Sequence, residues 1–363
     1  VPRPQPDVVA GLGQAIAAEQ LQPWLASLAP RDAEYKALSE AFLRYSERAA
    51  QRQSQPIPAG ETIRAGDIDP RVPAIAAALR AQGYLGEAPA EGQAPNLFTP
   101  AMAEAVGRMQ QDFGLKTDGV VGSNTLEVLN TGAAERARIL AINLERRRWL
   151  DRTPPATRIE VNTAAAMLDY WHDGAHADRR RVIVGQPGWE TPQLGSPIVR
   201  LVANPNWTVP KSIAEEEIIP QGPGYMAANN MVWRDGWIVQ LPGPQSALGL
   251  VKFDMDNPHA IYLHDTPAKS LFEGNQRHAS HGCVRVQDAV GFARMLAERQ
   301  GQLAEFEQAM TLNEETFVDL PQDIPVRLLY HTAYLGPDGR VLFRPDPYGW
   351  DESLAGALGL RVR

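Results

Sequence analysis

A pair of prolines, Pro154-Pro155, separates two sequence patterns that predict different kinds of fold. Adjacent prolines lack backbone N–H donors and fix φ, so neither a helix nor a strand is expected to run across them. After the pair, short alternating or β-branched runs are separated by Gly and Pro; they lie at 159–161, 181–184, 198–202, 237–241, 250–255 and 260–263. This spacing predicts a mainly-β sandwich or barrel of roughly 150 to 200 residues.

The part before the proline pair predicts helices. Residues 1–60 show helical spacing, as in Leu38, Phe42 and Tyr45, and are interpreted as a helical scaffold segment. Residues 63–131 predict a small helical module, in which Thr99 and Pro100 suit the N-cap and first position of a helix. Residues 133–155 predict a further helical linker. The predicted fold class is therefore multidomain α+β.

We place the β-rich domain at 157–350 and a C-terminal tail at 351–363. Within it, helical spacing returns at 287–310, and 326–334 with 340–343 predict closing strands. An insert at about 211–240 differs in composition from the runs around it and contains three consecutive glutamates at 215–217. It is interpreted as a mobile lid, with a solvated surface excursion as the alternative.

Composition narrows the possible partners. The chain has 363 residues and a formal net charge of −8, which argues against a nucleic-acid partner because phosphate binding needs clustered Lys and Arg. No apolar stretch approaches the ~20 residues of a membrane span. The sequence begins Val1-Pro2-Arg3-Pro4 and shows no signal-peptide pattern, which decides nothing about compartment.

The residues that suggest chemistry lie between 260 and 286. His264, His278, His281 and the single cysteine, Cys283, all fall in this segment. A free thiol with a pKa of about 8.5 is only slightly ionised at neutral pH, so a nucleophilic cysteine needs a base or a cation nearby. Gly282 leaves the backbone beside Cys283 open to a substrate. A zinc site made of these side chains and a purely structural cluster are the two alternatives.

The string Ser280-His281-Gly282-Cys283-Val284-Arg285, preceded by His264, resembles the signature of the L,D-transpeptidase family with the YkuD-type catalytic domain. The resemblance extends over roughly 157–350, including Asn204-Pro205-Asn206-Trp207 and Tyr262-Leu263-His264-Asp265-Thr266-Pro267. Residues 63–130 resemble a small peptidoglycan-binding module, through Gly114-Leu115, Asp118-Gly119-Val120-Val121-Gly122 and Thr125. The expected architecture is thus a YkuD-type β domain, a helical peptidoglycan-binding module and a helical scaffold.

The resemblance implies a role for each matching residue. Cys283 is expected to be the nucleophile and His264 the general base, with His281 beside the thiol. Ser280 and Gly282 are expected to set the loop geometry, and the backbone N–H groups of 281–283 to stabilise an oxyanion. The residues expected to contact substrate are Arg285, Ser280, Tyr262 and Trp207.

The implied reaction is ping-pong cross-linking of peptidoglycan, without a cofactor or metal. The thiolate attacks the third residue of a stem peptide, D-Ala leaves, and the amine of a second stem resolves the thioester into a 3→3 cross-link. Stem peptides and glycan are the expected partners, carbapenems the expected inhibitors and the periplasm the expected location. Alternatives are a hydrolase that uses the same thiol and a non-catalytic wall-binding protein.

Overall fold

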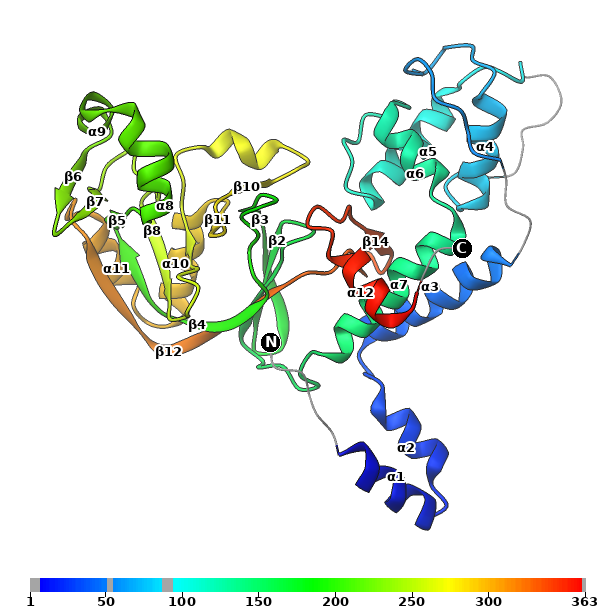
Figure 1. Cartoon of the computed structure of the whole chain (residues 1–363), viewed down its shortest axis with the longest axis horizontal. Helices are drawn as coiled ribbons and strands as arrows, with labels where there is room; N and C mark the ends of the chain where they lie inside the picture. The colour runs from blue at the N-terminus through cyan, green and yellow to red at the C-terminus, as the bar shows by residue number, and fades with distance from the viewer. Residues whose placement is uncertain (1–6, 51–54, 87–93, 361–363) are drawn as a thin grey trace. The chain divides into compact units, whose positions relative to one another are not determined.

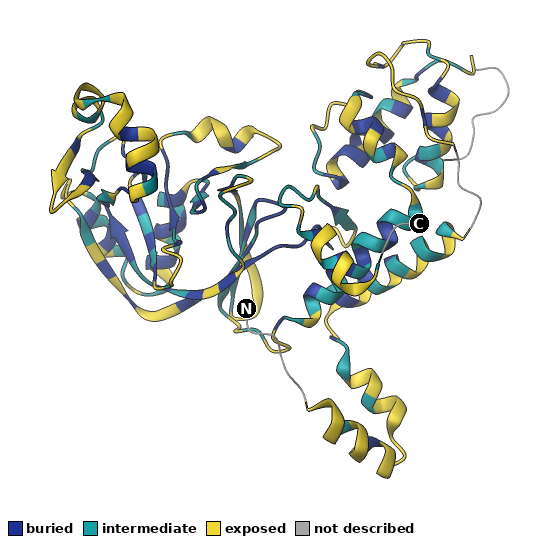
Figure 2. Cartoon of the chain, viewed as in Figure 1, coloured by how far each residue is buried: buried dark blue, intermediate teal, exposed yellow. Residues whose placement is uncertain are grey.

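The computed structural model describes residues 7–50, 55–86 and 94–360, which divide into two compact units. Residues 153–330 form the β-rich unit. The helical unit combines the residues up to 152 with those from 331 onward. Each unit encloses its own apolar core, and the buried residues follow the inner faces of its elements (Figures 1 and 2).

A mixed sheet forms the frame of the β-rich unit. Its strands are β1 (Arg158–Asn162), β2 (Met167–His172), β3 (Ala175–Gly185), β4 (Leu194–Ala203), β8 (Val251–Met255), β9 (Leu263–His264), β10 (His278–Ser280), β11 (Val284–Val286) and β12 (Thr316–Leu329). They are ordered β10-β3-β11-β9-β8-β4-β12-β1-β2, and β2 also pairs with β3. That last pairing closes the sheet on itself, so the predicted mainly-β barrel within a mixed α+β chain is confirmed.

Alternating burial explains why these segments form strands. In β8, Val251, Phe253 and Met255 are buried while the residues between them are less so. Helices α10 (Ala289–Arg299) and α11 (Leu303–Met310) add Phe292 and Phe306 to the same core. Burying each such side chain contributes about 1.5–3 kcal/mol. The helices predicted at 287–310 are confirmed.

The insert holds ordered elements around a small core of its own. The strands are β5 (Trp207–Thr208), β6 (Met231–Arg234) and β7 (Trp237–Gln240), in the order β5-β7-β6. The helical segments are α8 (Lys211–Ile213), η1 (Ala214–Ile218), η2 (Ile219–Gln221) and α9 (Pro223–Ala228), which gather at one end of the β-rich unit (Figure 1). Val209, Ile213, Ile218, Met231 and Ile238 form the core that keeps this insert folded.

The helical unit is built around one apolar core. Its helices are α1 (Val8–Ala17), α2 (Leu21–Leu28), α3 (Ala33–Ala49), α4 (Val72–Ala81), α5 (Pro100–Asp112), α6 (Ser123–Asn130), α7 (Ala133–Arg148) and α12 (Trp350–Leu358). The core joins Leu38 of α3, Val106 of α5 and Leu140 of α7, so the predicted scaffold and module share it. Thr99 caps α5 as predicted, accepting a hydrogen bond from the Met102 N–H at 3.3 Å.

The end of the chain lies in a different unit from the one expected. Residues 331–360 belong to the helical unit and contain the hairpin of β13 (Ala333–Leu335) and β14 (Val341–Phe343), followed by α12. The expected boundary at 350, the closing strand at 340–343 and the separate tail at 351–363 therefore differ from the structure. The reason is burial: Phe343 enters the helical core and stacks on Phe113 with ring centroids 5.2 Å apart.

A buried polar network also fixes this segment. Asn143 of α7 donates to the Thr332 hydroxyl at 2.8 Å and accepts from the Thr332 N–H at 3.0 Å. The Thr332 hydroxyl donates in turn to Asp351 at 2.6 Å, and Asp351 forms a buried ion pair with Arg146. Because polar groups buried this deeply must be partnered, the network ties α12 to α7.

We expect Asp351→Ala to destabilise the helical unit by about 3 kcal/mol, because it removes the ion pair from a buried arginine. Glu352→Ala is the matched control. Glu352 is 83% exposed and pairs with Arg138 at 3.2 Å, so its loss is expected to cost less than about 1 kcal/mol. Urea unfolding of both variants measures the difference, and equal midpoints would contradict this account.

Candidate active site

The candidate nucleophile and base lie on neighbouring parallel strands. In the β9–β11 register Leu263 is opposite Val284, and His264 is opposite Arg285. Leu263 and Val284 point into the barrel core, so His264 and Arg285 project from the other face. Tyr262 and Cys283 directly precede these two strands, and their side chains are hydrogen-bonded to each other. The fold therefore brings four of the predicted site residues together.

The Cys283 thiol is half-buried and adjoins Tyr262. Its Sγ lies 3.8 Å from the Ala260 carbonyl oxygen. Burial raises the pKa of the Cys283 thiol, while hydrogen bonds from the backbone N–H and hydroxyl of Tyr262, with the charges of Lys252 and Arg285, act in the opposite direction. The resting group at neutral pH is therefore the thiol.

Tyr262 links the thiol to the insert. Burial raises the pKa of the Tyr262 phenol well above its ordinary value, a hydrogen bond with Cys283 also raises it, and one from Trp207 lowers it. Trp207, in β5, is thereby placed beside Tyr262, and its contact with substrate stays a prediction. The Tyr262 and His264 rings also meet edge to face, with centroids 5.6 Å apart.

His264 is buried and neutral. Its Nδ1 lies 2.5 Å from the Asp265 carbonyl oxygen, and only 4% of the residue is exposed. Burial, followed by the positive charge of Arg285, lowers the pKa of His264 to about 3. With the proton on Nδ1 donated to this carbonyl, Nε2 keeps its lone pair. The ring is therefore uncharged at neutral pH, while hydrogen bonds with the backbone of Asp265 and Leu248 act against this lowering.

The loop between β10 and β11 is held in place by hydrogen bonds and has a shape that suits glycine. The buried Ser280 hydroxyl donates to the Cys283 carbonyl at 2.6 Å and accepts from the Gly282 N–H at 3.2 Å. Gly282 has φ +109°, which side-chain-bearing residues rarely adopt, and an added Cβ would lie 3.3 Å from Ile261. Thr191 donates to the Gly282 carbonyl at 2.7 Å. Sequence reasoning missed Thr191, which no local motif marks.

The expected oxyanion donors are only partly available. The Gly282 N–H is used by Ser280, contrary to the expectation that all three N–H groups of 281–283 face the substrate. Within the described ranges, the N–H groups of His281 and Cys283 have no hydrogen-bond partner. Two neighbouring donors therefore remain for a developing negative charge.

The same face carries the positive charges of Arg285 and Lys252. Arg285 has no carboxylate partner in the part of the chain that the structure describes, and its buried Nε has no acceptor. Lys252 pairs in register with His264, and its Nζ lies 4.7 Å from the centre of the Tyr262 ring and 2.7 Å from Asp254. Lys252 was not predicted as a site residue. The pattern that could have identified it is its position in β8 between buried Val251 and Phe253, which directs its side chain away from the core. Arg285 and Lys252 suit an anionic substrate.

His281 and His278 have separate surroundings. His281 Nε2 lies 2.7 Å from Glu217 of η1, and its ring meets Trp189 edge to face at 5.1 Å. His278 Nε2 lies 3.0 Å from the Thr163 carbonyl, and burial lowers its pKa. Among residues 7–50, 55–86 and 94–360, no group of three or more His, Cys, Asp or Glu side chains could hold a metal ion.

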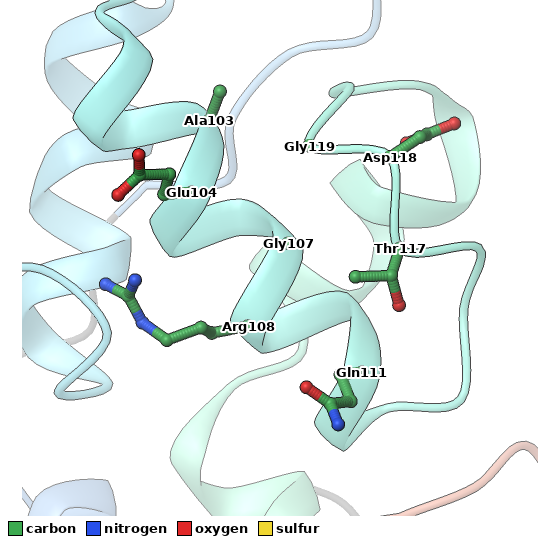
Figure 3. A pocket seen from close by; sticks show the side chains of 8 residues that line it. All are labelled: Ala103, Glu104, Gly107, Arg108, Gln111, Thr117, Asp118 and Gly119. Atoms are coloured by element: carbon green, nitrogen blue, oxygen red, sulfur yellow. The ribbon is translucent and has the colours of Figure 1, made fainter.

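In the helical module, hydrogen bonds join several of the residues that carry the resemblance to a peptidoglycan-binding module. The buried Gln110 side chain donates to Asp118 at 3.1 Å and Thr125 at 3.1 Å, and accepts from the Gly119 N–H at 2.8 Å. These residues therefore hold the turn after α5. Beside this turn lies an open hollow of about 480 Å³ (Figure 3), lined by Ala103, Glu104, Gly107, Arg108, Gln111, Thr117, Asp118 and Gly119.

A half-buried thiol, a neutral imidazole and an unpaired arginine on one barrel face define the class of protein as a candidate cysteine enzyme. Residues 156–304 match the family model of the L,D-transpeptidase catalytic domain, YkuD, and residues 69–129 match the "Putative peptidoglycan binding domain". The chain thus carries a YkuD L,D-transpeptidase catalytic domain together with a peptidoglycan-binding domain.

Individual proteins show the same similarity. A "Putative L,D-transpeptidase" of Haemophilus influenzae is 31% identical over 220 residues, which cover 54% of this chain and 45% of the relative, so the match spans less than half of that relative. An L,D-transpeptidase structure from Stackebrandtia nassauensis is 15% identical, with a TM-score of 0.30 and coverage of 76% of this chain and 97% of that one. The ertapenem-acylated E. faecium catalytic domain is 13% identical, with a TM-score of 0.27 and coverage of 49% and 99%. TM-scores this low add no argument about the site.

Proposed function

We propose that this chain forms peptidoglycan cross-links by acyl transfer through a thioester on Cys283. The supporting observation is that Cys283 shares one barrel face with neutral His264 and unpaired Arg285. Neutral Nε2 of His264 takes the thiol proton as Sγ attacks the carbonyl of the third stem residue. The N–H groups of His281 and Cys283 stabilise the oxyanion, and Arg285 binds a substrate carboxylate.

The remaining steps return the enzyme to its resting state. The carbon–nitrogen bond to D-Ala breaks, and its amine leaves with the proton held by His264. The side-chain amine of a second stem then attacks the thioester, His264 accepts a proton from it, and Cys283 is released as the thiol. The product is a 3→3 cross-link when diaminopimelate supplies both the acyl group and the amine.

The product formed from purified stem tetrapeptides tests this function. We expect mass spectrometry to show a cross-linked dimer and released D-Ala with the wild-type chain. If the product is a tripeptide and no dimer forms, the same thiol would belong to a hydrolase. No product from well-folded protein would favour a non-catalytic wall-binding role.

The surroundings of the enzyme follow from its substrate. A chain acting on peptidoglycan works outside the cytoplasmic membrane, and the periplasm is the proposed compartment. In the described part of the chain, no helix is long and apolar enough to cross a membrane. The hollow beside α5, with Glu104, Arg108 and Gln111 on its rim, is the proposed contact of the module with glycan. Carbapenems are the proposed inhibitors, acylating Cys283.

The rate of acylation by a carbapenem should be nearly constant between about pH 5 and 8. Because the pKa of His264 is lowered to about 3, the imidazole stays neutral above that pH. Because the pKa of Cys283 is raised, the thiol stays protonated beyond the alkaline end of this range. Stopped-flow rates across the range measure this. A rate profile with a midpoint near pH 6.5 would contradict a neutral His264. A rate that rises tenfold per pH unit would indicate attack by the free thiolate.

The insert is proposed to be a lid that the Glu217–His281 pair holds against the nucleophile loop. Glu217→Gln weakens this charge-assisted hydrogen bond by about 1 kcal/mol, so we expect roughly fivefold faster hydrogen exchange in 214–221. Glu215→Gln, an equal charge change on the same segment, is the control. Equal exchange in the two variants would mean that the pair does not hold the insert.

A further inference from the structure

The helical unit contains a pocket that the proposed reaction does not use. Its volume is about 520 Å³, within the range of small-ligand sites. Its walls come from α3, the turn after α4, the end of α5 and the β13–β14 hairpin, four segments far apart in sequence. The charged side chains that line the pocket are Glu40, Arg44, Arg48, Arg108, Asp112 and Arg340.

A buried carboxylate with one unused oxygen lines this pocket. The Asp112 side chain is 4% exposed; its Oδ2 accepts from the Tyr84 hydroxyl and from Arg340, each at 2.9 Å. Its Oδ1 is buried and has no partner in the described ranges. An unsatisfied buried oxygen costs about 1–3 kcal/mol, and Asp112 lines the pocket, so a ligand whose donor reaches Oδ1 would satisfy it.

The rim of the pocket carries unneutralised cations. Arg44 and Arg48 lie one turn apart on the same face of α3 and are exposed. Neither has a carboxylate within ion-pair distance among the residues described. Arg108 adds a third guanidinium, oriented by a hydrogen bond to the Tyr84 carbonyl at 2.8 Å. Planar guanidinium groups bind carboxylates in a bidentate manner, so this rim suits a carboxylate-bearing ligand.

We propose that this pocket binds an acidic peptide whose carboxylates contact Arg44 and Arg48 and whose ammonium group donates to Asp112. A peptidoglycan stem peptide has this chemistry. Only the choice of that probe rests on the proposed function; the pocket and its charges do not. Binding here gives the helical unit a second contact with wall material, next to the hollow in Figure 3, with which the pocket shares Arg108.

Calorimetric titration of the full chain tests the proposal, after its single cysteine has been alkylated so that acylation plays no part. The probe is the tripeptide L-Ala-γ-D-Glu-meso-diaminopimelate. The test variant is Arg44→Ala/Arg48→Ala, and the control is Lys36→Ala/Arg64→Ala, which removes two exposed charges outside the pocket. Glutarate, which has two carboxylates and no donor, and inorganic phosphate are the comparison ligands.

We expect the tripeptide to bind at least tenfold more weakly to the test variant, and equally to the control and the wild type. Glutarate is expected to bind more weakly than the tripeptide, because it leaves Asp112 without a donor. Equal affinity in both variants, or no binding to the wild type, would overturn the proposal. Phosphate and glutarate binding as tightly as the tripeptide would mean an adventitious ion only. None of these results depends on whether a carbapenem acylates Cys283.

Discussion

Cys283→Ala abolishes the covalent adduct that the wild-type chain is expected to form with a carbapenem. The proposed adduct is a thioester, and Cys283 is the single cysteine, so no second thiol can replace it. Intact-protein mass spectrometry should show one added carbapenem on the wild type and none on the variant. The effect is all or none, which makes it the largest expected of any substitution in this chain.

Cys283→Ser provides the matched comparison. A serine keeps the size and the neighbours of the thiol but is much harder to ionise, so an adduct is expected to form slowly or not at all. Circular dichroism should show that both variants are folded, since the thiol is half-buried beside the core rather than within it. An adduct on the alanine variant would place the acylated group elsewhere and refute the assignment.

His264→Gln should slow acylation by about 10² to 10⁴-fold, the usual contribution of a positioned general base. The pH dependence should change with it. Without a neutral base, attack depends on free thiolate, so the remaining rate should rise about tenfold per pH unit towards the raised pKa of Cys283. Stopped-flow measurement from pH 5 to 9 checks both features. His259→Gln, the same change at an exposed histidine, is the control.

A stability measurement separates this catalytic effect from misfolding. The pKa of His264 is lowered to about 3 in the folded chain from an ordinary value of 6.5, so the unfolded chain binds the proton more tightly. This histidine therefore favours folding fully above pH 6.5, and that contribution is lost as the pH falls towards 3. Glutamine does not titrate, so the variant should lose less stability over this interval. An unchanged acid profile would contradict a buried neutral His264.

A local motif that resembles a known family led to the proposed chemistry, and local patterns of apolar residues predicted much of the secondary structure. The 280–285 motif and His264 were found because they resemble a family signature, whose proposed nucleophile, glycine and base lie within a short segment. Alternation of apolar residues predicted strands such as β8. In a strand with one face on a core, every second side chain is buried. The cap at Thr99 was equally local, because a side-chain oxygen meets an N–H three residues ahead.

Pairings between distant segments were decided only by the tertiary structure. Closure of the barrel through β2 and β3, and the parallel register that sets His264 beside Arg285, depend on which strands bury each other's faces. Lys252 joins the site only through that register.

The same limit explains the end of the chain. The pattern at 340–343 correctly predicted a short strand, which the structure has at Val341–Phe343. This strand does not close the barrel, because Phe343 stacks on Phe113 in the helical core. The sequence by itself thus predicted which residues are candidates for the chemistry and determined which local elements form, because both follow from near neighbours. Only the tertiary structure decided which elements share a core and which N–H groups and charges stay unpaired, because these depend on packing between distant segments.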